Sequence, residues 1–309
     1  MNTSTATPLA AHAPQAAAKG VEVIQLAEAC GAEVRGIDIV NGADEAGLAV
    51  LRDALNKHAV VLIRGQKLTP AQQTAFTKQL GEMRTSFYNR YGVPEHPELS
   101  IVSNIKREDG EALGIADAGM LWHTDASYLP TPDLYTLLYG ITIPHRDGKA
   151  IGDTVFSSTG AAYDDLPADL RKRLDGMRAV HSFTHHLDKK KSLGQLKRAP
   201  LTAEQKAALP DVSHPVVRRH PITGRACLFV TEGHTHYIEG LPEKESEELL
   251  EMLYSHIKNP QFHYRHTWQA NDMLIWDNPA LQHLAIFDYG DIPRRLHRAG
   301  VLGPVPQPV

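Results

Sequence analysis

The chain has 309 residues, of which 42% are hydrophobic and 22% charged, a balance typical of a globular protein rather than a disordered, collagen-like or coiled-coil one. Its formal net charge of -4 argues against nucleic acid or an anionic membrane as a partner. The sequence contains 17 histidines. Because histidine is the commonest metal ligand in proteins, the question is which of them converge on one site.

The N-terminal segment and the cysteines indicate how the chain is divided into domains and where in the cell it is expected. Residues 1–20 are rich in Ala, Thr and Pro and lack the basic start and leucine-rich middle of a secretory signal, so we expect a mobile tail followed by a single catalytic domain over 21–309. Cys30 and Cys227 form no CxxC pair, which favours the reducing cytoplasm. No apolar run approaches the roughly 18 residues of a membrane span.

Strands and helices alternate at the start of the chain. Apolar and polar residues alternate over 21–26 and 32–39, which predicts half-buried strands, and the apolar run at 60–65 predicts a third. Leucines at helical spacing predict a helix over 44–57. Thr69, followed by Pro70 and Gln72, is a typical N-cap and predicts a second helix that carries Phe76 and Leu80.

From about residue 98 the pattern is mainly β. Short strand-like runs are separated by turns rich in Gly, Pro, Asp and Asn, as in an all-β barrel or sandwich; the runs are LSIVSNI, LYTLLYGITI, DTVFSS, RACLFVT and DMLIWDN. Helices are predicted only at 167–177 and 242–257. A polar insertion at 185–214 would either cover a site as a lid or be solvated, and we expect its lysines 189–191 to be solvated surface.

Residues 122–125 read Trp-His-Thr-Asp. On an extended strand His123 and Asp125 point to the same face, so the two side chains can hold one metal ion. A second segment, WDNPALQHLAIFDYGDIPRRLHR at 276–298, supplies His283 and, beyond it, Arg294 and Arg298. Two imidazoles and one carboxylate on one face of an ion leave the opposite face open, as in non-haem Fe(II) oxygenases. An arginine beyond the distal histidine suits the far carboxylate of a dicarboxylic acid that chelates the metal.

With these motifs the sequence resembles the Fe(II)/2-oxoglutarate-dependent dioxygenases of the taurine dioxygenase and 2,4-dichlorophenoxyacetate dioxygenase (TauD/TfdA) family, roughly from Val21 to Gly303. The resemblance rests on WHTD, on GDT-x-F-x-S at 152–158 followed by AAYDDLP, on HPITGR at 220–225, and on WDNPALQH ending in RRLHR. It implies a mainly β fold with flanking helices, namely a double-stranded β-helix, which is a distorted, cupin-like jelly roll.

The resemblance also implies residue roles and cofactors. His123, Asp125 and His283 correspond to the iron ligands, Arg294 and Thr154 to the residues on the C5 carboxylate of 2-oxoglutarate, and Arg298 to the residue that pairs with an anionic prime substrate. The cofactors implied are Fe(II), the cosubstrate 2-oxoglutarate and O2. We also expect Asn104, on the strand before WHTD, to face the substrate pocket.

The implied reaction is hydroxylation of a small organic anion, such as a sulfonate, sulfate ester or aryloxyalkanoate, with decarboxylation of 2-oxoglutarate to succinate and CO2. The resemblance also implies a homodimer or homotetramer. Which anion is the substrate stays open, since Gly119 stands where taurine-specific relatives carry asparagine.

Three alternatives remain at this stage. Two histidines and a carboxylate are also a catalytic zinc set, so a Zn-dependent hydrolase on a jelly-roll scaffold is an alternative. A catalytically silent jelly-roll binding protein is another. A rival metal site at His234 and His236, which an extended strand would place on one face, has no carboxylate at motif spacing, so we expect those histidines at a loop or pocket rim.

Overall fold

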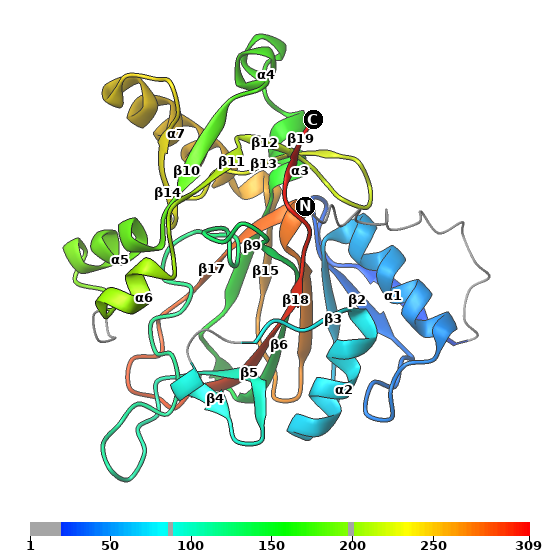
Figure 1. The fold of residues 1–309 in the computed structure, drawn as a ribbon. Coiled ribbons are helices and arrows are strands. Elements are labelled where there is room, and N and C mark those ends of the chain that lie inside the picture. The colour runs from blue at the N-terminus through cyan, green and yellow to red at the C-terminus, as the bar shows by residue number, and fades with distance from the viewer. Residues whose placement is uncertain (1–19, 86–88, 197–200) are drawn as a thin grey trace, which may run out of the picture.

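The computed structural model describes residues 20–85, 89–196 and 201–309, so the predicted tail lies outside the described residues except for Gly20. A large β-sheet runs through the molecule (Figure 1). Its strand order is β1-β2-β3-β16-β6-β18-β5-β4, with β1 at Glu22–Gln25, β2 at Ala32–Arg35, β3 at Val60–Ile63, β16 at Met273–Asp277, β6 at Asp133–Thr142, β18 at Arg295–Leu302, β5 at His96–Ser103 and β4 at Gly92–Val93. β2 and β3 pair in parallel, whereas the other neighbours pair antiparallel.

The central strands of this sheet are buried on both faces. In β16, Met273 and Ile275 belong to one apolar core, whereas Leu274 and Trp276 belong to another on the opposite face. A strand covered on both faces needs a continuous apolar run. This explains why LIW in the predicted run DMLIWDN carries no alternation.

Two helices, α1 (Glu45–His58) and α2 (Pro70–Leu80), cover one face of the sheet (Figure 1). Both predicted helix starts are confirmed: Asp44 accepts a hydrogen bond from the backbone N–H of Gly47, and Thr69 forms a complete capping box with Gln72. The strand predicted over 32–39 ends earlier, at Arg35, because Gly36 adopts a positive φ of 77°, which takes the chain out of the extended conformation.

A smaller sheet lies on the other face of the large one. It contains β15 (His263–His266), β9 (Thr154–Ser158) and β17 (Leu281–Ala285) in that order. Phe156 and Leu281 from this sheet share a buried core with Trp276 and Leu296 from the large sheet. Two facing sheets around a shared core form a distorted jelly roll. The predicted mainly β fold with flanking helices is therefore confirmed.

A further layer is built around helix α7 (Glu243–Ile257), which buries Leu249, Leu253 and Ile257 as its sequence pattern predicts. The elements of this part of the fold are α3 (Thr159–Asp164), α4 (Ala168–Leu174), β10 (Arg178–His181), β11 (Val212–Pro215), β12 (Val217–Arg219), β13 (Ala226–Leu228), β14 (Thr235–Ile238) and β19 (Gln307–Pro308). The minor elements elsewhere are β7 (His145–Arg146), β8 (Lys149–Ala150), η1 (Asn89–Tyr91), η2 (Pro260–Phe262) and η3 (Asn278–Ala280). Helix α4 is shorter than predicted because Asp175 is extended and Gly176 has a φ of 72°.

The insertion is partly helical, with α5 at Phe183–Ser192 and α6 at Ala203–Ala207. Ser182 caps α5 by accepting a hydrogen bond from the N–H of His185. The expectation of solvated lysines is wrong for Lys190, whose side chain is only 1% exposed and forms an ion pair with Asp117 at 2.8 Å. The charged run therefore contains one inward-facing lysine, on the helix that also buries Phe183 and Leu187.

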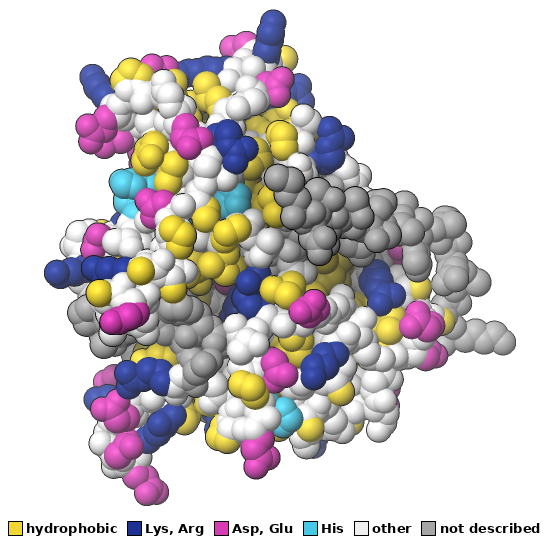
Figure 2. Space-filling model, in the orientation of Figure 1, with side chains coloured by type: hydrophobic (Ala, Val, Ile, Leu, Met, Phe, Trp, Pro, Cys, Tyr) yellow, Lys and Arg dark blue, Asp and Glu magenta, His cyan; other side chains and the backbone are white. Residues whose placement is uncertain are grey.

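The surface agrees with the charge balance of the sequence. On the face in Figure 2, basic and acidic side chains are interspersed rather than segregated into a patch of one sign. Within residues 20–85, 89–196 and 201–309, no helix is long and apolar enough to cross a bilayer.

Candidate functional site

The three predicted metal ligands come together in the structure. His123 and His283 form an isolated antiparallel bridge in which each backbone N–H donates to the other residue's carbonyl, at 3.1 and 2.9 Å. Their ring centroids are 4.2 Å apart. The sequence predicted an extended strand for WHTD. The structure has no regular strand there, because Asp125 already begins a turn. The bridge to β17 positions His123 instead.

The ligand atoms of His123, Asp125 and His283 all lie within 4.8 Å of one another. Nε2 of His123 is 3.5 Å from Oδ1 of Asp125, and Nε2 of His283 is 3.9 Å from Oδ2. Desolvation and the neighbouring His123 lower the pKa of His283 to about 3, so this imidazole stays neutral and keeps a lone pair for a metal. The geometry suits one ion held by two nitrogens and one oxygen.

The charge state of Asp125 is set by opposing effects. Burial raises the pKa of its carboxyl group, but the charge of Arg298 and the two imidazoles outweigh burial and hold the pKa well below its ordinary value. The carboxylate is thus anionic at neutral pH, as a metal ligand must be.

Residues around the cluster orient it. Nδ1 of His123 lies 2.8 Å from the carbonyl oxygen of Leu121, which favours the tautomer that leaves Nε2 free for a metal. The Thr136 hydroxyl donates to Oδ2 of Asp125 at 2.7 Å and accepts from the Asn278 side chain at 2.9 Å. Neither Thr136 nor Asn278 was identified from the sequence, although Asn278 belongs to the WDNPALQH run quoted above.

Arg294 is buried, with 3% of its surface exposed. One of its Nη atoms donates to the carbonyl oxygen of Gly152 at 3.2 Å, and its Nε has no hydrogen-bond partner among the described residues. A Cβ atom on Gly152 would come within 3.1 Å of that Nε. A buried guanidinium with an unused donor is costly unless an anion completes it.

Thr154 lies two residues beyond Gly152 and pairs in register with Ala285, two residues beyond His283. Its hydroxyl accepts a hydrogen bond from the Trp268 indole at 3.1 Å. The β9–β17 ladder thus connects the segment at Arg294 to the metal ligands.

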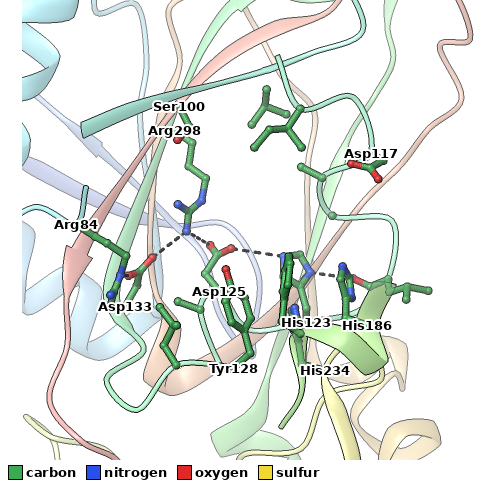
Figure 3. Close-up of a pocket in the computed structure, with 18 of the residues that line it drawn as sticks. Arg84, Ser100, Asp117, His123, Asp125, Tyr128, Asp133, His186, His234 and Arg298 are labelled. Carbon is green, nitrogen blue, oxygen red and sulfur yellow. Dashed lines mark hydrogen bonds and ion pairs between the residues drawn. The ribbon is translucent and has the colours of Figure 1, made fainter. Parts of the chain in front are cut away.

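A cavity of about 330 Å³ opens beside the cluster. Its wall includes His123, Asp125 and Arg298, and most of its remaining lining is apolar or aromatic, with Val102, Ile115, Ala118, Leu121, Ala126, Tyr128, Leu129, Phe183 and Leu209 among these residues. Figure 3 shows Arg298 on one side of Asp125 and the histidines on the other. Arg294 and Thr154 are not among the residues that line this cavity.

Arg298 faces two carboxylates. Its Nη2 lies 2.9 Å from Oδ2 of Asp133 and 3.3 Å from Oδ2 of Asp125. Burial disfavours its charge, but these two carboxylates raise its pKa above the ordinary value, so Arg298 is a permanent cation in the cavity wall. Asp133 and its other partner, Arg84, were not identified from the sequence.

The structure gives Asn104 bonds that connect backbone segments. Its amide donates to the carbonyl oxygens of Gly290 and Ile292, both at 3.0 Å, and its oxygen accepts from the N–H of Arg294 at 2.8 Å. The residue is not among those lining the cavity. Asn104 therefore holds the backbone at Arg294. The sequence had suggested instead that its side chain faces the pocket.

The expectation that His234 and His236 share a face is wrong. His234 is buried, lines the cavity and stacks on His186 with ring centroids 4.4 Å apart. His236 is exposed and stacks on His185 instead. The chain turns at His234 before β14 begins, so the alternation of an extended strand does not apply.

Comparisons with known proteins give a consistent result. Residues 22–299 match the family described as "Taurine catabolism dioxygenase TauD, TfdA family". The chain is 34% identical over 262 residues to an alpha-ketoglutarate-dependent 2,4-dichlorophenoxyacetate dioxygenase of Burkholderia sp. (strain RASC), covering 82% of this chain and 84% of the relative. It is 32% identical over 294 residues to an alpha-ketoglutarate-dependent sulfate ester dioxygenase of Pseudomonas putida, covering 93% and 91%.

Solved structures agree. A putative alpha-ketoglutarate-dependent taurine dioxygenase from Burkholderia xenovorans superposes with a TM-score of 0.76 at 34% identity, covering 93% of this chain and 94% of that one. AAD-2 in complex with Mn(II) and N-oxalylglycine superposes with a TM-score of 0.75 at 27% identity, covering 93% and 99%. These relatives favour the dioxygenase over the Zn-dependent hydrolase considered from the sequence.

Proposed function

This chain belongs to the TauD/TfdA family and is an Fe(II)- and 2-oxoglutarate-dependent dioxygenase, and we propose that its His123, Asp125 and His283 hold the iron and that it hydroxylates a small organic anion. The observation that carries the proposal is the convergence of these three side chains, with ligand atoms within 4.8 Å. A neutral His283 and an anionic Asp125 suit Fe(II), which accepts imidazole and carboxylate ligands and leaves positions open.

Arg294 and Thr154 are proposed to bind 2-oxoglutarate. The unused Nε of the buried Arg294 fits a carboxylate, because an anion there would satisfy this donor and pair with the buried guanidinium. Asn104 supports this arrangement by accepting a hydrogen bond from the Arg294 backbone.

Bound iron would supply dioxygen activation, which couples decarboxylation of 2-oxoglutarate to succinate and CO2 with hydroxylation of a C–H bond. The chain itself binds the substrates, orients the metal ligands and excludes water. Thr136 and Leu121 orient the ligands, Arg298 offers a cation to the substrate anion, and apolar residues such as Leu121, Leu129 and Phe183 keep the cavity dry.

The cavity and the relatives support a substrate class. The relatives are named for 2,4-dichlorophenoxyacetate and for sulfate esters, and this cavity joins a cation to an apolar wall. We therefore propose a sulfonate, sulfate ester or carboxylate with an apolar body. The single catalytic domain over 21–309, the cytoplasmic location and the homodimeric or homotetrameric state stay predictions.

An anaerobic titration tests the metal site. Fe(II) and 2-oxoglutarate added to the purified protein should produce the weak visible charge-transfer band of this class of dioxygenase. His123→Ala should lose the band and stay folded by circular dichroism, whereas His236→Ala, which changes the exposed histidine of the rival pair, should keep it. A band that survives in His123→Ala would refute the ligand assignment.

A second experiment separates the two arginines. Arg294→Ala should weaken 2-oxoglutarate on the order of 100-fold, because it removes a charge-assisted contact in a buried site. Arg298→Ala should chiefly weaken the prime substrate found in a succinate-release screen over sulfonates, alkyl sulfates and aryloxyalkanoates. The exposed Arg219→Ala is the control. Equal effects of Arg294→Ala and Arg298→Ala on both ligands would show that this division is wrong.

A further inference from the structure

The carboxylate of Asp133 lies between two arginines in the wall of the cavity (Figure 3). Its side chain is 0% exposed. Oδ1 accepts a hydrogen bond from Nε of Arg84, and Oδ2 accepts one from Nη2 of Arg298 at 2.9 Å. Arg84 also donates from Nη2 to the carbonyl oxygen of Thr131. The three side chains form one ion-paired cluster, Arg84–Asp133–Arg298, that connects β6 and β18 with the segment after α2.

The net charge of this cluster depends on Arg84. Arg298 and Asp133 form a pair with no net charge, so Arg298 would attract a substrate anion only weakly if it were the sole cation. Arg84 adds a second positive charge, and the cluster then carries a net charge of about +1. The charge on Asp125 does not cancel it in the loaded enzyme, because the metal compensates that carboxylate.

Both guanidinium groups keep donors for a ligand. Nη1 of Arg84, and Nε and Nη1 of Arg298, make no hydrogen bond to the described residues. The two side chains are 20% and 26% exposed, and both line the cavity. Both guanidinium groups, which pair with the same carboxylate, are therefore available to an oxyanion in the cavity.

We propose that Arg84 is a second anion-binding residue of the prime-substrate pocket, and that the positive charge it adds offsets the charge of Asp133, which ion-pairs with both arginines. The inference rests on the proposed function, since it takes the cavity as the substrate site. The ligand is an oxyanion of the sulfonate, sulfate or carboxylate class on an apolar body. Its anionic end lies at the arginines, next to Asp125, which brings the carbon atoms near that end close to the metal ligands.

The test uses the protein loaded with Mn(II) and N-oxalylglycine, which keeps it from turning over. Binding of hexane-1-sulfonate, phenoxyacetate and the neutral hexan-1-ol is measured by calorimetry. The wild type should bind at least one of the two anions more tightly than the alcohol. Arg84→Gln should weaken binding of that anion about tenfold and leave the alcohol unchanged. Arg90→Gln, an exposed arginine paired with Glu111 away from the cavity, is the matched control.

A double variant distinguishes this role from a structural one. In Arg84→Gln with Asp133→Asn, the charge of Arg298 is no longer cancelled, so the net charge of about +1 returns and anion binding should recover at least threefold relative to Arg84→Gln. If Arg84 only supported the fold, losing Asp133 as well would not restore binding. Folding of each variant is checked by circular dichroism.

Three results overturn the inference: no preference of the wild type for either anion over hexan-1-ol, unchanged anion affinity in Arg84→Gln, or no recovery in the double variant. The charge-transfer band with Fe(II) and 2-oxoglutarate is measured in parallel on the same proteins. If the band is present while any of these results is found, the inference fails and the proposed metal site stands. If the wild type gives no band, the proposed function fails.

Discussion

Asp125 uses its two oxygens differently. Oδ2 accepts from Thr136 at 2.7 Å and faces Arg298 at 3.3 Å, whereas Oδ1 lies 3.5 Å from Nε2 of His123. Oδ1 is therefore the oxygen better placed for a metal, and Thr136 holds the carboxylate in the orientation that presents it. Such outer contacts commonly matter nearly as much as the ligands themselves.

Thr136→Val tests this orientation, since it keeps the shape of the side chain and removes the hydroxyl. Metal affinity should fall about tenfold to 100-fold, because Asp125 would lose the donor that fixes its rotamer. Titration of Mn(II) into the metal-free protein measures the change. Thr142→Val, at the end of the same strand and without the hydrogen bond to Asp125 that Thr136 makes, should leave the affinity as in the wild type. An unchanged affinity in Thr136→Val would show that Asp125 is held by other contacts.

Helix α5 is the element that turns the insertion into part of the site. Phe183 and His186 on this helix line the cavity. Lys190, one turn beyond His186, donates to the backbone carbonyl of Asp117 at 2.6 Å and pairs with its carboxylate at 2.8 Å. Asp117 lies in the segment leading to WHTD and also lines the cavity. The pair thus attaches α5 to the segment that leads to WHTD.

Lys190→Met should destabilise the protein by about 3 kcal/mol, because the buried carboxylate of Asp117 loses a charged partner. It should also speed amide hydrogen exchange in α5 relative to β16 and β6. Urea unfolding and exchange mass spectrometry measure the two effects. The exposed neighbour Lys191 provides the matched control, Lys191→Met, which should change stability by less than about 0.5 kcal/mol. Faster exchange confined to some other element would count against the attachment of α5.

At the scale of the whole molecule, buried neutral histidines make stability depend on pH. Desolvation lowers the pKa of both His214 and His297 from 6.5 to about 4. Between these values the unfolded chain binds more protons than the folded one, so stability is present above the unfolded pKa and is lost as pH falls toward the folded pKa.

The free energy of unfolding should therefore fall as pH is lowered from about 6.5 to 4, with each such histidine contributing on the order of 1 kcal/mol per pH unit. Urea titrations at a series of pH values measure the slope. His297→Gln should reduce the slope, because glutamine does not titrate, and the exposed His145→Gln serves as its control. A slope that is the same in all three proteins would place the acid sensitivity in other groups.

Local sequence patterns were enough for much of the fold. The leucine stripe of α1, the N-cap at Thr69 and the apolar stripe of α7 are set by residues within a few positions of one another, and all three are found in the structure. The wrong boundaries, at Gly36 and Gly176, lie where a glycine adopts positive φ. A propensity pattern does not distinguish such a glycine from one that continues an element.

The proposed site residues were also accessible from the sequence, because His123, Asp125, His283, Arg294 and Arg298 occur in two short motifs whose types and spacing suit one metal and its cosubstrate. Their surroundings were not. Arg84 and Asp133 are 49 positions apart, and Lys190 and Asp117 are 73 apart. Whether such charges are solvated or paired depends on which chain segments fold against each other, and on the desolvation that makes a buried partner necessary.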